Sequence, residues 1–483
     1  MITQIETQLK YPFLYKWQKK GGTSILTNSF HEPYFNLFET NLSVENCAAL
    51  LNTIAGNFAV VIQRENYFLA AMDRVRSFPL FYKIQGNKIL FTDDISSSEK
   101  EFIVDEQSIR SFTKIFCTEG DNTLLENWKQ IQAGEYVFIN KISGEISVNK
   151  YFTFRSKSPA KKINLAELKD IFLKVFKSIL DEIGDKTIII PLSGGYDSRC
   201  IIAILKELEA KNIFAYTYGT AGSFEKKIAQ QVAQKLNINW HFIEYTAELL
   251  DSFFEEKWKS FCSKNHGFTS LPNEQDFFAL LYLQNNNLLP HNAVILSGYL
   301  GDYLAGCKIK FHGIGTNEDD QIEYLYLNRG SKYIVNSIRL YEYFGLEWFI
   351  PFGAGSILDY IFHVPLNERQ TKSGYNNFLS DAFFKPLDID FKKPDHYFKK
   401  APFKNILKKY LPRKIVSLIQ NRNSFNEKKD PNNTMYLRKR LSKITSADRK
   451  QKTESFNEMY AKYFIHCLKQ EVASGEILQQ TNK

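Results

Sequence analysis

The amino-acid sequence predicts an α/β protein built from two units of different architecture. Short strand-like runs separated by turn residues fill the chain up to about residue 150, which predicts a predominantly antiparallel sheet with a few helices. After a polar stretch, apolar strands alternate with amphipathic helices, and this rhythm predicts a doubly wound parallel sheet. The length of 483 residues agrees with two units, because one ordinary core rarely extends so far.

The strand pattern of the first unit is carried by five runs. They are residues 57–62, 67–71, 80–82, 88–91 and 135–139. The stretch 155–162 follows them and is the best linker candidate, because it is polar and basic and contains a proline. We therefore expect one domain over residues 1–154 and a second over residues 163–483.

The second unit begins with a helical pattern over residues 165–183, where apolar residues recur at helical spacing. A continuous apolar run follows, of the kind that is buried inside a parallel sheet. The predicted strands are residues 187–192, 213–218, 240–243 and 293–296, with helices at about 197–210 and 226–236. Right-handed crossovers between such strands give a doubly wound sheet, and the rest of the chain has the pattern of helices and a polar tail.

Bulk composition narrows the class of protein. The chain has no apolar run of about 18 residues, so no membrane span is expected, and no signal-peptide pattern, which predicts a cytoplasmic protein. Its six cysteines form no CxxC pair and its eight histidines no HExxH motif, so no metal held by Cys or His is expected. The net charge of +9 comes largely from late basic clusters, which we interpret as solvated helical faces.

One loop carries the chemistry that the residues indicate. The sequence SGGYDS, residues 193–198, follows the first strand of the predicted parallel sheet, where such folds bind ligands. Gly194 and Gly195 let the backbone turn and present N–H groups to an anion, and Ser193 and Ser198 add hydroxyl donors. Asp197 is suited to hold the magnesium that neutralises phosphates. An N-capped corner would need only part of this pattern, and no GxxxxGK[ST] loop is present.

The same loop resembles the pyrophosphate-binding loop of the N-type ATP pyrophosphatases, and that of the asparagine synthetase family in particular. Residues 296–306, LSGYLGDYLAG, are similar to the family's LSGEGADELFGG, and residues 345–352, GLEWFIPF, are similar to GLEARVPF. The resemblance implies an adenine nucleotide α-hydrolase-like domain that uses ATP and Mg²⁺, with Asp197 and Asp302 as metal ligands. It also implies that Glu347 lies beside an acyl-adenylate, where the glutamate of ring-closing relatives helps to deprotonate the attacking amine.

The first unit resembles the family's glutaminase domain, which implies an Ntn-hydrolase-like fold. The scaffold motifs of that domain recur in order at residues 56–59, 72–74, 79–82 and 91–94. The glutaminase uses a cysteine directly after Met1, whereas this chain has Ile2 there and its first cysteine at Cys47. The resemblance therefore implies a degenerate domain without glutaminase chemistry. Arg422 lies near the position of a family lysine that stabilises pyrophosphate release, and it would keep the positive charge.

The resemblance implies an amide-forming reaction. A substrate carboxylate would attack the α-phosphorus of ATP to give an acyl-adenylate and pyrophosphate, and an amine or ammonia would then attack the acyl carbon. The expected partners are a small-molecule carboxylate and an amine or ammonia, without nucleic acid, and a homodimer is one option for the assembly. Three alternatives stay open: an enzyme that modifies tRNA, a catalytically inactive partner subunit, and a synthetase that receives ammonia from a separate glutaminase. The pathway, whether for amino acids, natural products or surface polysaccharides, stays open as well.

Overall fold

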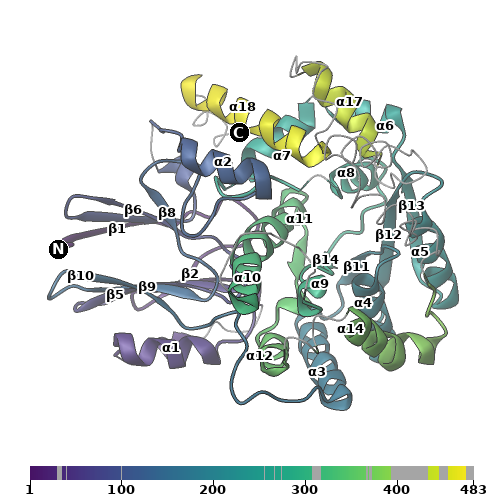
Figure 1. The fold of residues 1–483 in the computed structure, drawn as a ribbon, viewed down its shortest axis with the longest axis horizontal. Helices are drawn as coiled ribbons and strands as arrows, with labels where there is room; N and C mark the ends of the chain where they lie inside the picture. Colours follow the sequence, from purple (N-terminus) through teal and green to yellow (C-terminus); the bar gives the residue numbers. More distant parts are fainter. Residues whose placement is uncertain are drawn as a thin grey trace, which may run out of the picture.

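The computed structural model consists of a first unit of two stacked sheets and a second unit built on one parallel sheet (Figure 1). The structure describes residues 1–29, 35–39, 41–98, 101–254, 256–265, 267–273, 275–306, 317–365, 368, 372–392, 433–444 and 455–474. Among the helices of these segments, none combines the length and the apolar composition that crossing a bilayer requires.

The first unit contains a six-stranded antiparallel sheet and a four-stranded mixed sheet. The larger has the order β10-β9-β5-β4-β3-β2, formed by β2 (Gln18–Lys20), β3 (Thr23–Thr27), β4 (Phe58–Gln63), β5 (Tyr67–Met72), β9 (Glu135–Asn140) and β10 (Glu145–Lys150). The smaller has the order β1-β7-β6-β8, formed by β1 (Gln4–Gln8), β6 (Phe81–Gln85), β7 (Lys88–Thr92) and β8 (Trp128–Gln130). Strand β1 pairs with β7 in parallel, whereas β6 is antiparallel to both of its neighbours. The strand-rich prediction is confirmed, and the division into two sheets is new.

Helices cover the outer faces of these two sheets. Figure 1 shows α1 (Val44–Thr53) below the six-stranded sheet and α2 (Glu106–Ile115) above the four-stranded one. Every residue of β5 is buried, because both faces of this central strand are covered. Tyr136 of β9 fixes α1 to the sheet, since its Oη donates to the carbonyl of Val44 at 2.9 Å. The layers of helix, sheet, sheet and helix agree with the Ntn-hydrolase-like fold that the resemblance implied.

Residues 155–162, the predicted linker, form an irregular connection that is held against the second unit. Arg155 pairs with Asp320 and Glu323, and Lys157 pairs with Asp359. Polar composition here therefore reflects ion pairs along a surface as well as exposure to water. The boundaries at residues 154 and 163 stay a prediction.

The second unit is built on five parallel strands in the order β13-β12-β11-β14-β15. They are β11 (Thr187–Pro191), β12 (Ile213–Gly219), β13 (Asn239–Glu244), β14 (Ala293–Leu296) and β15 (Glu347–Phe349). The chain runs outward from β11 to β13 and then crosses to the other side of β11 for β14 and β15. The carboxyl ends of β11 and β14 thus form the switch point of a doubly wound sheet, where such folds bind ligands. The predicted fold class is confirmed.

Helices surround this sheet and fill the space between the two units (Figure 1). They are α3 (Leu165–Ile183), α4 (Tyr196–Glu207), α5 (Phe224–Lys235), α6 (Ala247–Phe254), α7 (Glu256–Asn265), α8 (Phe277–Asn285), α9 (Gly301–Leu304), α10 (Glu318–Leu325), α11 (Arg339–Tyr343), α12 (Gly355–His363), α14 (Lys372–Leu379), α17 (Thr434–Ile444) and α18 (Phe456–Ser474). Shorter helical segments are η1 (Phe35–Phe38), η2 (Ile95–Ser97), η4 (Val335–Ile338), η5 (Pro351–Gly353) and η7 (Lys385–Leu387), with π-helices at η3 (Tyr326–Ile334) and η6 (Ser380–Phe384).

Buried polar contacts join the two units beside β15. Trp348 N–H donates to Tyr15 Oη at 3.2 Å, and Asn28 Nδ2 donates to the Trp348 carbonyl at 2.9 Å. Tyr11 Oη donates to the Glu342 carboxylate at 2.9 Å. All of these residues are buried, so their hydrogen bonds are shielded from water in the folded protein. Separating the units would break these bonds. The first unit is therefore fixed against the edge strand of the parallel sheet.

Candidate active site

The SGGYDS loop lies at the carboxyl end of β11 and is closed by its own serines. Ser193 N–H donates to Ser198 Oγ at 3.0 Å, and Gly195 N–H donates to Ser193 Oγ at 3.0 Å. The two hydroxyl oxygens are 3.2 Å apart. Gly195 is also the N-cap of α4, so the first N–H groups of that helix open onto the loop. A tight turn in front of a helix N-terminus is an arrangement that attracts anions.

A second helix N-terminus approaches the same loop. A Cβ on Gly194 would lie 3.0 Å from the Cα of Glu225, which is in the first turn of α5. Glycine is needed here because any side chain would have to displace helix backbone. Ser223 caps α5, since its Oγ accepts the N–H of Glu225 at 3.2 Å. The positive ends of α4 and α5 therefore both lie at the carboxyl edge of the sheet.

The loop that follows β14 packs directly on Asp197. A Cβ on Gly298 would lie 3.3 Å from Asp197 Cβ, and one on Gly301 would lie 2.9 Å from it and overlap the carboxyl group. These two glycines therefore make room for the Asp197 side chain. Asp302 follows Gly301 in α9 and is exposed. The structure thus brings Asp197 and Asp302, the two expected metal ligands, to one switch point.

A buried hydroxyl lies near these carboxylates. Tyr375 of α14 is 6% exposed, and its Oη has no hydrogen-bond partner among the residues that the structure describes. Burial raises the pKa of Tyr375 well above its usual value, and the negative charges that raise it further include Asp197 and Asp302. The phenol is therefore within electrostatic range of both carboxylates and has an unused donor. No sequence pattern pointed to it, because α14 follows both loops by a long stretch of chain.

Arg199 holds the SGGYDS loop from behind. Its guanidinium donates to the Gly194 carbonyl at 3.1 Å and to the Phe391 carbonyl at 2.9 Å. The side chain is fully buried, and burial lowers the pKa of this arginine. The sequence motifs did not indicate Arg199 as a site residue. The available signal was a charged side chain next to the apolar run that follows it in α4, because a buried charge needs polar partners.

Two of the predicted site residues are not placed at this switch point. Strand register puts Glu347 level with Ile188, and Ser193 lies five residues beyond Ile188. At about 3.3 Å per residue, this separates Glu347 from the loop by about 16 Å along the sheet. Glu347 instead forms an ion pair with Lys186 at the amino end of the strands. Arg422 lies outside the described residues, so its role stays a prediction.

A buried carboxylate that the sequence did not predict lies behind the second loop. Asp276 is 5% exposed and accepts hydrogen bonds from Tyr216 Oη at 3.1 Å and from Tyr341 Oη at 3.3 Å. Tyr341 Oη is in turn 3.3 Å from the Oη of Tyr299, which precedes Asp302 in the loop after β14. Burial raises the pKa of Asp276 although the tyrosine hydroxyls lower it. A hydrogen-bonded path therefore joins Tyr299 to a carboxylate that accepts protons readily.

The thiols of the first unit are buried and unreactive. Burial raises the pKa of Cys47 to about 12 and that of Cys117 to about 12 as well, which keeps both protonated at neutral pH. Ile2 is packed in the core, and its N–H donates to the Gly144 carbonyl at 2.9 Å. The described part of the first unit therefore contains no activated thiol.

Comparison with protein families assigns the region that holds both loops. Residues 182–336 match the family model described as asparagine synthase. This segment belongs to the asparagine synthase family. It covers about a third of the chain and includes Asp197 and Asp302. The asparagine synthase match indicates ATP-dependent chemistry of the synthetase type. Comparison with curated proteins gives no match.

Solved structures similar to the chain include three synthetases. An NH3-dependent NAD synthetase from Campylobacter jejuni is 14% identical with a TM-score of 0.22, and the match covers 55% of this chain and 95% of that one. An NMN synthetase from Francisella tularensis is 13% identical with a TM-score of 0.23, and the match covers 48% of this chain and 98% of that one. A glutamine-dependent NAD+ synthetase from Acinetobacter baumannii, solved with ADP, is 14% identical with a TM-score of 0.24. This match covers 65% of this chain and 72% of that one. Similarity at this level carries no inference about substrate.

Proposed function

We propose that this chain is an ATP-dependent ligase that activates a substrate carboxylate as an acyl-adenylate, releases pyrophosphate and forms an amide. The observation that carries the proposal is the meeting of two glycine loops at one switch point, with Asp197 against Gly301 and Asp302 next to it. A carboxylate oxygen would attack the α-phosphorus and expel pyrophosphate. An amine would then attack the acyl carbon and expel AMP, so that each step breaks one bond and forms one.

The residues at the switch point fit Mg²⁺ and the phosphates of ATP. Protein-bound Mg²⁺ is usually held by one or two carboxylates together with substrate phosphates, and Asp197 and Asp302 provide two. Within the described segments, no group of three or more Asp, Glu, His or Cys forms a self-sufficient metal site. Tyr375 Oη adds a buried donor that has no hydrogen-bond partner in the described segments. When bound, Mg²⁺ would neutralise charge on the leaving pyrophosphate.

The loop itself would hold the leaving group. Its N–H groups, together with the hydroxyls of Ser193 and Ser198, would donate to pyrophosphate oxygens at the N-terminus of α4. Arg199 holds the Gly194 carbonyl from behind, so the loop would keep its shape while charge develops. Arg422 stays a proposed further phosphate ligand.

The attacking amine needs a proton acceptor, and the structure favours Asp276 over Glu347. Glu347 is paired with Lys186 at the far end of the strands, whereas Asp276 is reached from Tyr299 through Tyr341. A proton could pass along these hydroxyls to the carboxylate of Asp276, whose pKa is raised by burial so that it accepts a proton more readily than an exposed aspartate. Glu347 stays the alternative acceptor.

The nitrogen source that we propose is free ammonia or an amine on a second substrate. Support comes from the first unit, where Cys47 is buried and its pKa is raised to about 12. A cysteine nucleophile acts as a thiolate, and such a thiol does not ionise at neutral pH.

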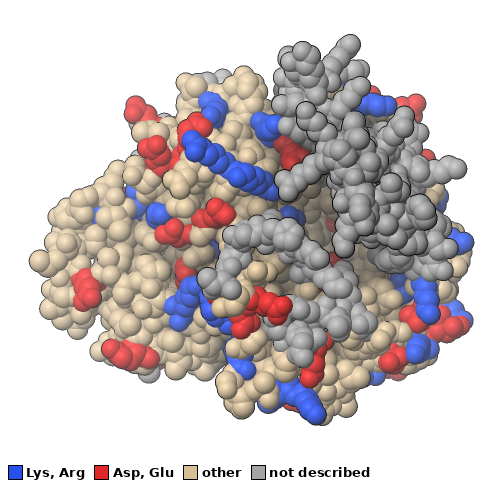
Figure 2. Space-filling model, in the orientation of Figure 1, with Lys and Arg blue, Asp and Glu red and all other residues tan. Residues whose placement is uncertain are grey.

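On the face drawn in Figure 2, the described residues give no support for nucleic acid as a substrate. Figure 2 shows Lys and Arg interspersed with Asp and Glu over the described surface of this face, without a broad basic area. In the basic run at residues 438–440, Arg440 is paired with Asp251. The small-molecule reaction is therefore preferred to tRNA modification.

ATP–pyrophosphate exchange tests the proposal, with amino acids, acidic sugars and small peptides as candidate carboxylates. We expect exchange with one class of acid, and a loss of at least about 100-fold in Asp197→Asn and in Asp302→Asn, because each removes a carboxylate ligand of the Mg²⁺ that would neutralise the phosphates. Asp170→Asn, an exposed change on α3, is the matched control and should exchange normally. Exchange that persists in Asp197→Asn would show that Asp197 does not take part in the reaction. Absence of exchange with every acid would favour the inactive partner subunit.

A further inference from the structure

Arg76 lies between the first unit and η3 and is sealed from solvent. It is 1% exposed, and its three guanidinium nitrogens have no hydrogen-bond partner among the described residues. Its guanidinium carbon lies 5.7 Å from the centre of the Phe81 ring. A guanidinium carries five N–H donors, and burying them unpaired is costly for a neutral group and more so for a cation. The described part of the chain therefore supplies no acceptor to this guanidinium.

The carboxylate that interacts electrostatically with Arg76, that of Asp73, already has its oxygens occupied by other donors. Asp73 accepts the N–H groups of Phe58 at 2.9 Å, Val75 at 2.8 Å and Ser77 at 3.2 Å, and it also accepts Ser77 Oγ–H. Four donors occupy the lone-pair sites of its two oxygens. Asp73 therefore offsets the charge of Arg76 only from a distance, and burial still lowers the pKa of Arg76 to about 9.

A second buried cation increases the local positive charge. Lys332 of η3 is fully buried, and its Nζ donates to the carbonyls of Thr118 at 2.9 Å and Gly120 at 2.5 Å and to Asn328 Oδ1 at 3.0 Å. Burial lowers its pKa to about 7, and Arg76 is among the groups that lower it. The two cations therefore repel each other across the junction of the units.

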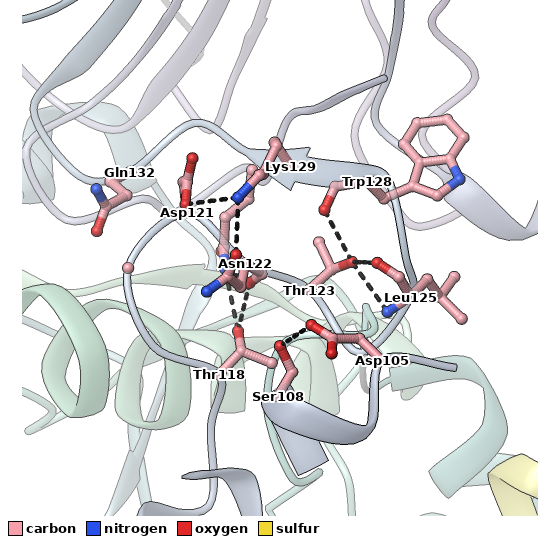
Figure 3. A network of polar contacts seen from close by, with 12 residues as sticks. Asp105, Ser108, Thr118, Asp121, Asn122, Thr123, Leu125, Trp128, Lys129 and Gln132 are labelled. Atoms are coloured by element: carbon pink, nitrogen blue, oxygen red, sulfur yellow. Dashed lines mark hydrogen bonds and ion pairs between the residues drawn. The ribbon is translucent and has the colours of Figure 1, made fainter. Parts of the chain in front are cut away.

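The loop that binds Lys332 uses its own polar groups internally (Figure 3). Thr118 Oγ1 donates to the Asn122 carbonyl at 2.7 Å and accepts from Gln130 Nε2 at 3.1 Å. Lys129 Nζ donates to Asp121 Oδ1 at 3.1 Å and to Asn122 Oδ1 at 2.8 Å. The carboxylate of Asp121 is thus paired with Lys129, and it accepts no hydrogen bond from Arg76.

We propose that Arg76 binds a small inorganic anion, chloride being the probe, in the junction between the two units. The guanidinium offers up to five N–H donors. Lys332 adds a second buried positive charge, and Asp73 is the buried carboxylate that offsets Arg76. Because the nitrogens are sealed from solvent, the occupant has to be small, and a monoatomic anion is the class that meets both requirements. Binding would stabilise the contact of the first unit with η3. It is independent of the proposed nucleotide site and of any ligase activity.

The test is thermal unfolding of the full chain in sodium chloride and in sodium gluconate at equal ionic strength. Above the dissociation constant, each tenfold rise in chloride should multiply the folding equilibrium constant by about ten, so Tm should rise with chloride and stay flat in gluconate. Arg76→Met should abolish this dependence. Arg110→Met, which removes an exposed arginine from α2, should keep it.

Crystals soaked in bromide give an independent measurement, and an anomalous peak beside the Arg76 guanidinium is expected. Equal Tm values in the two salts, or ordered water alone beside Arg76, would overturn the proposal. Should Arg76→Met fail to fold, the two salts and the bromide soak still decide the question on the unmodified protein.

Discussion

Tyr375 carries a hydroxyl that no other described group satisfies. Burying an unpaired hydroxyl costs about 1–3 kcal/mol, and a phenylalanine would fill the same space without that cost. Arg199 and Asp276 show the opposite situation, since each has buried partners at hydrogen-bonding distance. The unused donor near Asp197 and Asp302 is therefore best explained by a ligand that binds between them.

Tyr375→Phe separates a ligand-binding role from a structural one. We expect the free energy of unfolding to stay the same or rise by up to about 1 kcal/mol, because an unpaired polar atom is removed. Pyrophosphate exchange should fall by roughly tenfold, because one donor to the ligand is lost. Chemical denaturation and exchange assays measure the two effects.

Tyr360→Phe is the matched control for this change. Tyr360 Oη donates to the Asn164 carbonyl at 2.9 Å in α12, away from the loops. Its loss should lower stability by about 1 kcal/mol and leave exchange unchanged. A Tyr375→Phe variant that is less stable but exchanges normally would show that the hydroxyl serves the fold alone.

At the scale of elements, the site depends on how closely two loops approach. The loop after β14 touches the loop after β11 through Gly298 and Gly301, which lie against Asp197. The parallel pairing of β11 with β14 sets the spacing, and the missing side chains allow the contact. Both carboxylates would therefore move if either loop were displaced.

Gly301→Ala tests this contact. The added Cβ would overlap the Asp197 carboxyl group, so that side chain has to move away from its place in the site. We expect pyrophosphate exchange to fall by at least about tenfold, because a shift of about 1 Å in a positioned group has effects of this size or larger. Gly222→Ala has open space around its Cβ and should behave as the unmodified chain. Equal exchange in both variants would show that the loops tolerate separation.

At the scale of the whole molecule, the last described helix ties the two units together. Helix α18 contacts α17 and also returns to the first unit, where Phe464 stacks on Phe112 of α2 with 5.6 Å between ring centroids (Figure 1). Lys469 pairs with Glu106 on the same helix. Together with the buried polar contacts beside β15, these contacts of α18 fix the first unit against the second. The first unit therefore has a structural role, although its thiols are unreactive.

Phe464→Ala should weaken this connection. Phe464 is 5% exposed, and truncating a buried phenylalanine usually costs about 3–5 kcal/mol through lost burial and the cavity left behind. We expect a lower denaturation midpoint and faster proteolysis within α18. His466→Ala, at an exposed position of the same helix, should leave both unchanged. A Phe464→Ala midpoint equal to that of the unmodified chain would show that α18 does not contribute to the joint stability of the units.

Local features were predictable from the sequence because neighbours along the chain determine them. The apolar run predicted at residues 187–192 is β11 (Thr187–Pro191), and the run at 213–218 is β12 (Ile213–Gly219). The SGGYDS turn was recognisable because glycine and serine meet the needs of a tight strand–helix corner within six residues. The change of rhythm after the linker likewise predicted the fold class.

The sequence by itself thus determined the two architectures and the loop that we propose to bind phosphates. Tertiary structure alone decided which distant groups meet: Gly301 against Asp197, Tyr375 near both carboxylates, Asp276 behind Tyr299. It also placed Glu347 at the amino end of its strand, which a motif cannot reveal because motif spacing carries no strand register. The physical reason is that hydrophobic periodicity and turn chemistry act between neighbours, whereas strand order and packing bring together residues that the chain keeps far apart.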